Sequence, residues 1–307
     1  MIRHFLRDDD LSPEEHNQII ERALSLKAAP YSDKCLSGPR SVAMIFDKPT
    51  LRTQASFSVA ISDLGGAPML VDGQLAQIGI RESIADTARV LGRMTSAIVW
   101  RTGDQSRIQE MAEYAGVPVI NALTDQFHPC QGIADLLTIR EHKGGLAGLA
   151  LAMVGDAASN MSHTYLLSGA LAGMQVRLSG PPGYEPAPEV LERASEIAAQ
   201  TGGSVKFTHD PNEAVAGADA VATDTWVSMG KEAEAEQRLD QFAAWQLNSQ
   251  LLEQADSDAI VLHCLPAYRG KEITAEVIDG PRSVVFDEAE NRLHAQKAVI
   301  SFLMEQS

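Results

Sequence analysis

The chain reads Ser41-Val-Ala-Met-Ile-Phe46, then Asp47-Lys-Pro-Thr-Leu-Arg-Thr53, then an amphipathic segment that closes on Gly65-Gly66. The first run is apolar and has the length of a strand, and Pro49 marks the turn after it. Apolar residues then recur at helical spacing until the two glycines, which are typical of a helix end. The sequence therefore predicts a strand, a short turn and a helix, a pattern that repeats along the chain.

The predicted start of this helix carries groups that suit a phosphate. A helix N-terminus leaves backbone N–H groups without intrahelical partners and presents the positive end of the helix dipole. The same corner carries the hydroxyls of Thr50 and Thr53 and the guanidinium of Arg52. One interpretation is an anion-binding corner. The other is an ordinary helix start, in which Thr50 or Thr53 is only the cap and Arg52 is solvated.

Length and composition are those of a soluble globular protein. The 307 residues suffice for roughly two domains, and 45% apolar with 21% charged residues is an ordinary composition. No apolar run reaches membrane-spanning length, and the N-terminus lacks the pattern of a signal or transit peptide. We therefore expect a cytoplasmic protein. The unpaired spacing of Cys35, Cys130 and Cys264 argues against a disulfide framework or a structural zinc site.

The net charge restricts the partners. A charge of −16 and a pI near 4.9 argue against general binding to nucleic acid or to an anionic membrane. An anionic substrate would need a local basic pocket set against this overall charge. Local groups of Arg and His are therefore more informative here than they would be in a basic protein.

Strands and helices alternate through the first half of the chain. We predict strands at residues 41–46, 68–71, 97–100 and 117–120, with helices that begin near Ser12, Gln54, Ser83, Ser106 and Phe127. The helix from Ser83 is predicted to run to Met94, and residues 72–83 before it to form a long polar loop. This alternation predicts an α/β fold with a parallel sheet covered on both faces. Ligands of such sheets bind at the carboxyl ends of the strands, where we find Lys48 to Thr53, Arg101 and His128 to Gln131.

A Gly-rich break at residues 143–148 separates the two halves. We place a domain boundary there, with one domain at residues 1–145 plus a returning C-terminal helix at 288–307, and the other at residues 146–287. The second domain is predicted to contain a charge-rich loop that ends near Asp240. Its predicted strands are at residues 149–154, 175–178, 204–208, 220–223, 259–262 and 284–286.

Two classes of enzyme are disfavoured by missing motifs. The G-x-G-x-x-G spacing of dinucleotide-binding proteins is absent after the strand that ends at Val154, and no G-x-x-x-x-G-K-[ST] phosphate loop occurs. We therefore rank an NAD-dependent dehydrogenase or a nucleoside-triphosphate enzyme low. His263 with Cys264 lacks the ligand spacing of a metal site, so we expect no metal.

Four motifs resemble those of the aspartate and ornithine transcarbamoylases. The phosphate loop is Phe46-Asp-Lys-Pro-Thr-Leu-Arg-Thr53, and later come Phe127-His-Pro-Cys-Gln131, Asp224-Thr-Trp-Val-Ser-Met-Gly230 and His263-Cys-Leu-Pro266. They follow the family's order and spacing over nearly the whole chain. The last two resemble the versions of enzymes that act on ornithine. The resemblance therefore implies free ornithine as the acceptor, rather than aspartate, putrescine or an N-acylated ornithine.

The phosphate loop departs from the family at three positions. The family usually reads Ser-Thr-Arg-Thr-Arg, whereas this chain has Thr50, Leu51, Arg52, Thr53 and Gln54. Thr50 keeps a hydroxyl, and Leu51 still offers its backbone N–H. The charge lost at Gln54 either weakens phosphate affinity or lies outside the contacts to the phosphate. Because Arg52 and Thr53 are intact, we interpret the loop as active.

The resemblance implies transfer of a carbamoyl group from carbamoyl phosphate to the δ-amine of L-ornithine, which gives L-citrulline and phosphate. It implies no cofactor, a place in arginine biosynthesis, and a homotrimer in which Gln77 reaches the neighbouring subunit's site. The residues with implied catalytic roles are Arg52, Arg101, His128, Gln131 and Cys264. Those implied to bind carbamoyl phosphate are Thr50, Leu51, Arg52, Thr53, Gln77, Arg101, His128, Gln131, Cys264, Leu265 and Arg292.

By the same resemblance, the second domain binds ornithine. Asn160 and the backbone of Met229 are implied for the α-carboxylate, and Asp224 and Ser228 for the α-amino group. Cys264 lies where the family has a thiol near the δ-amine. From the residues alone, Cys264 is equally well explained as a small buried side chain and Met229 as a packing residue. Two further alternatives remain, a transcarbamoylase for another amine and a non-catalytic member of the family.

Overall fold

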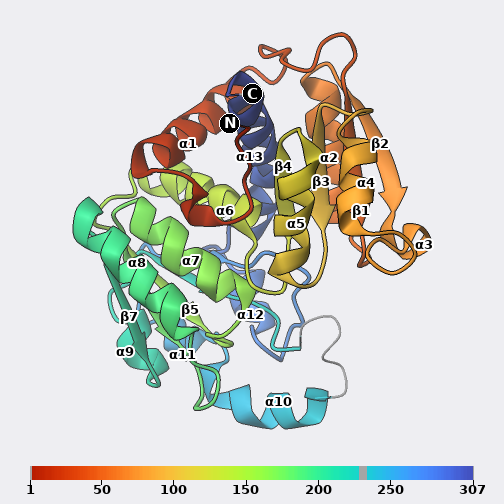
Figure 1. The fold of residues 1–307 in the computed structure, drawn as a ribbon. Helices are drawn as coiled ribbons and strands as arrows, with labels where there is room; N and C mark the ends of the chain where they lie inside the picture. The colour runs from red at the N-terminus through yellow and green to blue at the C-terminus, as the bar shows by residue number, and fades with distance from the viewer. Residues whose placement is uncertain (1, 228–233, 307) are drawn as a thin grey trace. The chain divides into compact units, whose positions relative to one another are not determined.

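The computed structural model describes residues 2–227 and 234–306 (Figure 1). The chain forms two compact units, which we call unit 1 (residues 1–137 and 290–307) and unit 2 (residues 138–289). Both unit boundaries fall inside helices, namely α6 (Pro129–Lys143) and α13 (Val285–Glu305). The functional boundary expected after residue 145, with a return at residue 288, stays a prediction. No helix in the described ranges is both long enough and apolar enough to cross a membrane.

Unit 1 is built on a four-stranded parallel sheet in the order β2-β1-β3-β4. Residue Phe46 at the end of β1 pairs with Arg101 at the end of β3, and Arg101 pairs with Leu123 at the end of β4. The predicted convergence of three strand ends at one edge is therefore confirmed. The strands are β1 (Ser41–Phe46), β2 (Ala67–Asp72), β3 (Ala97–Arg101) and β4 (Val119–Leu123).

Helices cover this sheet and provide its core. One core cluster contains Trp100 of β3 together with Ile84 from α4 and Ile108 and Met111 from α5. The predicted start of α1 is confirmed, because the Ser12 side chain accepts a hydrogen bond from the Glu15 N–H. The helices are η1 (Asp8–Asp10), α1 (Pro13–Ala28), α2 (Arg52–Asp63), α3 (Gly73–Ala76), α4 (Ile84–Leu91) and α5 (Gln105–Ala115).

The second part of α13 returns to unit 1 and lies beside α1 (Figure 1). Arg22 of α1 donates to Ser301 at 2.8 Å, and Lys27 donates to Asn291 at 2.8 Å. Lys297 is fully buried, and its Nζ lies 3.2 Å from a carboxylate oxygen of Asp63 in α2. These bonds attach the part of α13 that contains Arg292 to unit 1, the unit that also contains the phosphate loop. The predicted return of the C-terminal helix is confirmed.

Unit 2 repeats the architecture with a five-stranded parallel sheet in the order β7-β6-β5-β8-β9. Its strands are β5 (Ala150–Val154), β6 (Gln175–Ser179), β7 (Ser204–Thr208), β8 (Ala220–Thr223) and β9 (Ile260–Leu262). Its helices are α7 (Asn160–Leu171), α8 (Pro188–Thr201), α9 (Pro211–Val215), α10 (Ala235–Phe242), η3 (Ala243–Trp245), α11 (Ser249–Leu252) and α12 (Ala275–Ile278).

One predicted strand is wrong. Residues 284–286 do not form a strand, because α13 begins at Val285 and the Glu288 N–H donates to the Val284 carbonyl at 2.9 Å. Three apolar residues are too few to distinguish a short strand from the first turn of a helix. Next to this segment, the described part of the chain has an isolated β-bridge between Val261 and Ser283.

Other differences concern the ends of elements and two loops. Helix α4 ends at Leu91 rather than Met94, and β4 lies at residues 119–123 rather than 117–120. The loop predicted at residues 72–83 contains the short helix α3. The charge-rich segment predicted as a loop contains α10, whose polar face hides the helical spacing of its few apolar residues.

Candidate active site

The turn between β1 and α2 leaves the helix N-terminus open. The residue at the N-cap position of the helix is Leu51, and its side chain makes no capping hydrogen bond. The interpretation that Thr50 or Thr53 only caps the helix is therefore wrong. The Leu51 side chain is 78% exposed, so this position offers its backbone. Arg52 has no hydrogen-bond or ion-pair partner among the described residues, so its guanidinium is available to a ligand.

Arg292 of α13 connects the phosphate loop to helix α6. Its Nη2 donates to the Thr53 Oγ1 at 2.6 Å, and its Nη1 donates to the Gln131 Oε1. The Gln131 amide in turn donates to Asp135 at 2.7 Å. All four side chains are at most 4% exposed. The structure thus brings together three residues predicted from distant parts of the sequence, and it adds Asp135.

Asp135 was not predicted as a site residue, although its spacing offered a signal. It lies four residues after Gln131, on the same face of a helix. Its carboxylate accepts the Gln131 N–H and so holds the amide in one orientation. A buried carboxylate at this spacing from a proposed ligand-binding amide is the pattern that sequence analysis missed.

His128 and Arg101 complete a basic group at this edge of the unit 1 sheet. Burial and the positive charges of Arg292 and Arg101 lower the pKa of His128 well below 6.5. The imidazole is therefore neutral at pH 7 and has one ring N–H to donate. In a chain of net charge −16, two buried arginines beside a neutral histidine form a local basic group of the kind that an anionic substrate requires. Such donors can hold a phosphate and polarise a neighbouring carbonyl.

Two predicted residues have a backbone conformation that is rare outside glycine. Gln77, at the end of α3, has φ of 49°, and Leu265 has φ of 57°. They are the only non-glycine residues with positive φ in the ranges that the structure describes. Such strain is often retained where a functional group must be aimed. Gln77 lies in unit 1 and Leu265 in unit 2.

In unit 2, the ends of β8 and β9 bring Asp224 next to Cys264. The thiol donates to a carboxylate oxygen of Asp224 at 3.3 Å. Burial raises the pKa of the Asp224 carboxyl. The His263 Nδ1 accepts the Leu265 N–H at 3.0 Å, which leaves its Nε2 to contact Glu272 at 3.2 Å. Both ring nitrogens of His263 are therefore occupied by protein groups.

The thiol, imidazole and carboxylate of this cluster raise the question of a metal. Ligand atoms of Asp224, His263 and Cys264 all lie within 4.8 Å of one another, and these are ligand types that zinc accepts. The arrangement fits a metal poorly, because the imidazole already makes a hydrogen bond through each nitrogen. The expectation of no metal stays a prediction.

Arg238 of α10 connects the segment before Asn160 with the segment after Asp224, and it is not among the predicted site residues. Its Nη1 lies 2.8 Å from an Asp156 carboxylate oxygen and 2.9 Å from the Trp226 carbonyl. Asp156 lies in the turn before α7, whose first residue is Asn160. The charge-rich sequence around Arg238 predicts a loop, so no pattern in it indicates this role. Ser228 and Met229 lie outside the described residues.

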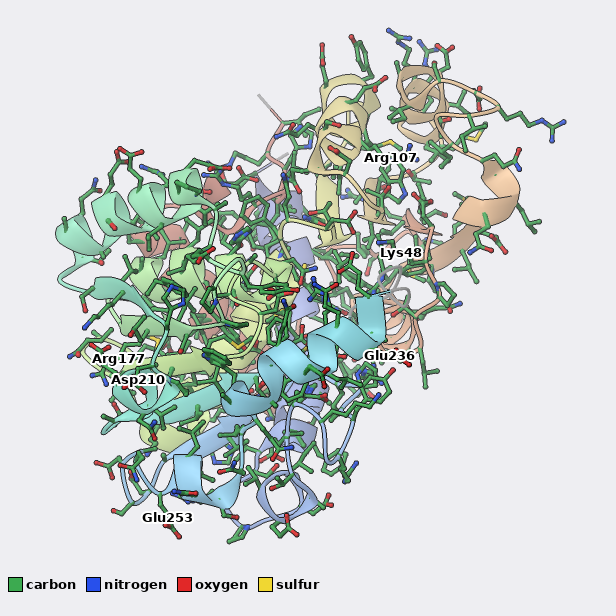
Figure 2. The ribbon with its side chains drawn as sticks, turned by 90° about the horizontal axis from the view of Figure 1, so that it is seen from below. Lys48, Arg107, Arg177, Asp210, Glu236 and Glu253 are labelled. Carbon is green, nitrogen blue, oxygen red and sulfur yellow. The ribbon has the colours of Figure 1, made fainter. Side chains whose placement is uncertain are left out.

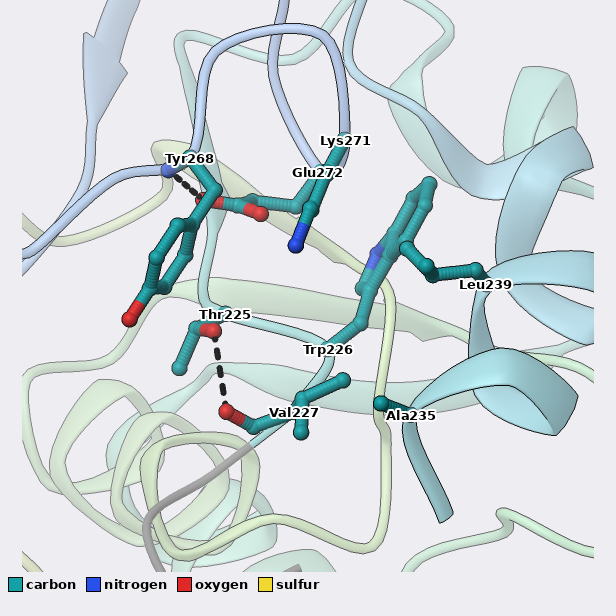
Figure 3. Close-up of a pocket in the computed structure, with 8 residues that line it drawn as sticks. All are labelled: Thr225, Trp226, Val227, Ala235, Leu239, Tyr268, Lys271 and Glu272. Carbon is teal, nitrogen blue, oxygen red and sulfur yellow. Dashed lines mark hydrogen bonds between the residues drawn. The ribbon is translucent and has the colours of Figure 1, made fainter. Parts of the chain in front are cut away.

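A cavity of about 250 Å³ in unit 2 is lined in part by Thr225, the residue that follows Asp224. Figure 3 shows Tyr268 and Trp226 on opposite sides of it, with the Lys271 side chain between them. The lining residues are Thr225, Trp226, Val227, Ala235, Leu239, Tyr268, Lys271 and Glu272. Apolar walls with a few charged groups suit a small polar molecule.

Comparisons with known proteins cover both units. Residues 3–141 match the carbamoyl-P binding domain of aspartate/ornithine carbamoyltransferase, and residues 147–303 match the Asp/Orn binding domain of the same family. An ornithine carbamoyltransferase from Clavibacter sepedonicus is 58% identical over 100% of both chains.

Solved structures agree with this match. The ornithine carbamoyltransferase from Pyrococcus furiosus is 44% identical with a TM-score of 0.95, over 99% of this chain and 98% of that one. An anabolic ornithine carbamoyltransferase from Campylobacter jejuni is 37% identical with a TM-score of 0.95, over 100% of both chains.

Proposed function

This chain belongs to the aspartate/ornithine carbamoyltransferase family, and we propose that it transfers the carbamoyl group of carbamoyl phosphate to the δ-amine of L-ornithine. The products are L-citrulline and phosphate. The observation that carries this function is similarity to ornithine carbamoyltransferases along the full length, with 58% identity to one of them. The basic group of unit 1 and the Asp224–Cys264 pair of unit 2 are consistent with the two substrates.

Unit 1 binds carbamoyl phosphate in this proposal. The open N-terminus of α2, with the backbone of Leu51 and the hydroxyl of Thr50, holds the phosphate oxygens. Arg52 supplies a permanent charge and a bidentate donor. Arg292 joins from α13, and its bond to Thr53 supports a shared role at this corner.

The carbamoyl group lies beside His128 in this proposal. Arg101, the His128 N–H and the Thr53 hydroxyl stabilise the negative charge that develops on the carbonyl oxygen when the amine attacks. Gln131 and the backbone carbonyl of Leu265 hold the carbamoyl NH2. The positive φ of Leu265 supports a carbonyl aimed at a ligand.

Ornithine binds to unit 2 through its amino-acid end. Asn160 and the Met229 backbone take the α-carboxylate, while Asp224 and Ser228 take the α-amino group. The Cys264 thiol lies near the δ-amine. This amine attacks the carbonyl carbon of carbamoyl phosphate in its neutral form, and a tetrahedral intermediate forms. Collapse of the intermediate breaks the bond between that carbon and the phosphate oxygen, and the leaving phosphate takes the proton that the nitrogen loses. The cavity that begins beside Asp224 supports an acceptor site in this part of unit 2.

The active assembly is a homotrimer in which Gln77 reaches the neighbouring subunit's site. Exposed apolar side chains on the edge strand β2, on the neighbouring helices α2 and α3, and in the turns beside them support an interface there, since such side chains are usually covered. We call them the exposed apolar group. It consists of Leu51, Val59, Leu70, Leu75 and Ile80, all between 46% and 82% exposed. We place the enzyme in the cytoplasm and in arginine biosynthesis. The similar structure from Campylobacter jejuni is that of an anabolic ornithine carbamoyltransferase, which supports the biosynthetic direction.

Titration calorimetry with carbamoyl phosphate tests the first half of this function. An enzyme of this class binds carbamoyl phosphate without ornithine, and Arg52→Ala weakens that binding at least about tenfold. A non-catalytic member of the family need not bind the ligand. Absence of any binding heat at millimolar carbamoyl phosphate would overturn the assignment of the phosphate loop.

A further inference from the structure

Arg107, on helix α5 of unit 1, lies near Asp47 at the base of the loop that carries Lys48. Figure 2 labels both Arg107 and Lys48. Its Nε donates to the Thr102 hydroxyl at 2.9 Å, and its Nη2 donates to the Ile78 carbonyl at 2.8 Å. The guanidinium lies over the Trp100 ring, 5.2 Å from the ring centre. One side chain thus contacts two separate segments while its charge is held against an aromatic face.

The first segment is the base of the phosphate loop. The Thr102 hydroxyl donates to an Asp47 carboxylate oxygen at 2.6 Å, and the same oxygen lies 3.6 Å from Arg107. Asp47 is the first residue after β1, and its N–H donates to the Arg101 carbonyl at 3.0 Å. Arg107 and Asp47 therefore fix the point from which the loop leaves the sheet, beside the strand end that carries Arg101.

The second segment carries Gln77. Ile78 follows Gln77 directly, so the Arg107 bond to the Ile78 carbonyl fixes the peptide group next to it. Gly79 has φ of 79°, and a Cβ at this position would lie 3.0 Å from the Arg107 Nη1. At the other end of the segment, a Cβ on Gly73 would lie 2.1 Å from an Asp47 carboxylate oxygen. Both ends of this segment are thus fitted against the Asp47 and Arg107 side chains.

We propose that Arg107 is a positioning residue for the binding of carbamoyl phosphate. Its side chain fixes the position of the phosphate loop relative to the segment that carries Gln77. It acts through Asp47 and through the Ile78 carbonyl and touches no substrate. This inference rests on the proposed function. Because Gln77 serves the neighbouring subunit's site in the proposed trimer, Arg107 links the loop of one site to a residue of the next.

The test compares Arg107→Met with Arg107→Lys in steady-state citrulline formation. Methionine keeps the unbranched stem and removes every donor, whereas lysine keeps the charge but lacks the planar fork that spans both segments. We expect Arg107→Met to raise the KM of carbamoyl phosphate at least about tenfold, with little change in the KM of ornithine. Arg107→Lys restores only part of the loss.

Arg89→Met is the matched control. Arg89 also lies over an aromatic ring, that of Tyr114 at 4.6 Å, and also bonds a carboxylate, that of Asp86 at 2.9 Å. Neither contact involves the phosphate loop or the Gln77 segment. Melting temperatures are measured for every variant. A merely structural role of Arg107 predicts a lower melting temperature with an unchanged KM for carbamoyl phosphate, which would overturn the proposal.

A double-mutant cycle with Gln77→Ala supplies the second measurement. If Arg107 acts partly through Gln77, the increase in KM caused by Arg107→Met is smaller in the Gln77→Ala background than in the wild type. Effects that simply multiply would overturn the link between the two segments. A wild-type protein that forms no citrulline would instead overturn the proposed function, so the two failures are distinguishable.

Discussion

Arg292 and Thr53 show how single side chains of this protein assemble a site from distant parts of the sequence. The two residues are separated by 239 positions and joined by a hydrogen bond of 2.6 Å. Arg292 also bonds Gln131, so one guanidinium joins the helices α2, α6 and α13. Each bond orients a donor before substrate arrives, which is the condition for strong electrostatic stabilisation.

At this scale the sharpest prediction concerns Arg52. Replacement by alanine is expected to reduce kcat by about 100- to 1,000-fold, since one such donor contributes about 3–4 kcal/mol to the transition state. The fold should persist, because Arg52 has no partner among the described residues that would be left unsatisfied. Citrulline formation and circular dichroism measure the two effects. Arg93→Ala, at an exposed position after α4, is the control, and near-normal turnover of Arg52→Ala would contradict the loop assignment.

His128 gives a prediction about pH. Its pKa is lowered by burial and by Arg292 and Arg101, so the folded protein favours the neutral ring. As the pH falls below 6.5, His128 becomes protonated in the unfolded chain but stays neutral in the folded protein. The free energy of unfolding therefore decreases until the pH reaches the lowered pKa of His128 in the folded state. His128→Asn should therefore lose less stability than the wild type between pH 7 and about pH 5.5.

Urea denaturation at the two pH values measures this difference. Above pH 6.5, the pH dependence of the rate of citrulline formation should have the same shape in His128→Asn as in the wild type, because the His128 ring is already neutral there. The rate itself should be lower in the variant. An inflection near pH 6.5 that disappears with the substitution would show that His128 titrates in the working range.

Among the elements, α13 has the most consequence for the site, because its return places Arg292. Lys297 is fully buried, and its removal leaves the Asp63 carboxylate, whose side chain is only 14% exposed, without this partner. Lys297→Ala should lower the free energy of unfolding by about 3 kcal/mol and also weaken carbamoyl-phosphate binding. Lys34→Ala is the control, since the exposed Lys34 donates to the backbone of the same Asp63. Equal melting temperatures of the two variants in calorimetry would contradict the prediction.

The elements also show which parts of the fold the sequence can predict. The sequence predicts the largely buried strands β1 and β5 almost to the residue, because long apolar runs bounded by turn residues leave little ambiguity. The run at residues 284–286 was too short to separate strand from helix. Helix α10 was missed because charges dominate its exposed face.

For the site, motifs supply the residues but not their partners. The sequence identified Thr53, Gln131 and Arg292, yet the hydrogen bonds between them depend on how α6 and α13 pack, which no local pattern encodes. Asp135 lies four residues after Gln131 on the same helix, so its spacing offers a signal in the sequence. The partner of Arg238 is Asp156, 82 residues away, and a contact of this kind becomes visible only when side chains are placed in space.

At the scale of the whole molecule, the exposed apolar group near β2 leads to a prediction about assembly. We expect a mass of about 99 kDa in solution, three times the 33.0 kDa of the chain. Leu70→Glu, on the exposed face of β2, should shift the protein toward 33 kDa and reduce activity, since Gln77 would no longer reach a neighbour. Met94→Glu, at an exposed position after α4, serves as the control. Light scattering that gives 33 kDa for the wild type would contradict the trimer.

Ornithine carbamoyl transfer itself is tested most directly by one assay. Citrulline or the corresponding carbamoylated product is measured from carbamoyl phosphate with ornithine, aspartate, putrescine and N-acetylornithine in parallel. We predict rapid product with ornithine alone. Product from a different amine would leave the role of unit 1 intact and contradict the acceptor assignment of unit 2, and no product from any amine would contradict the function as a whole.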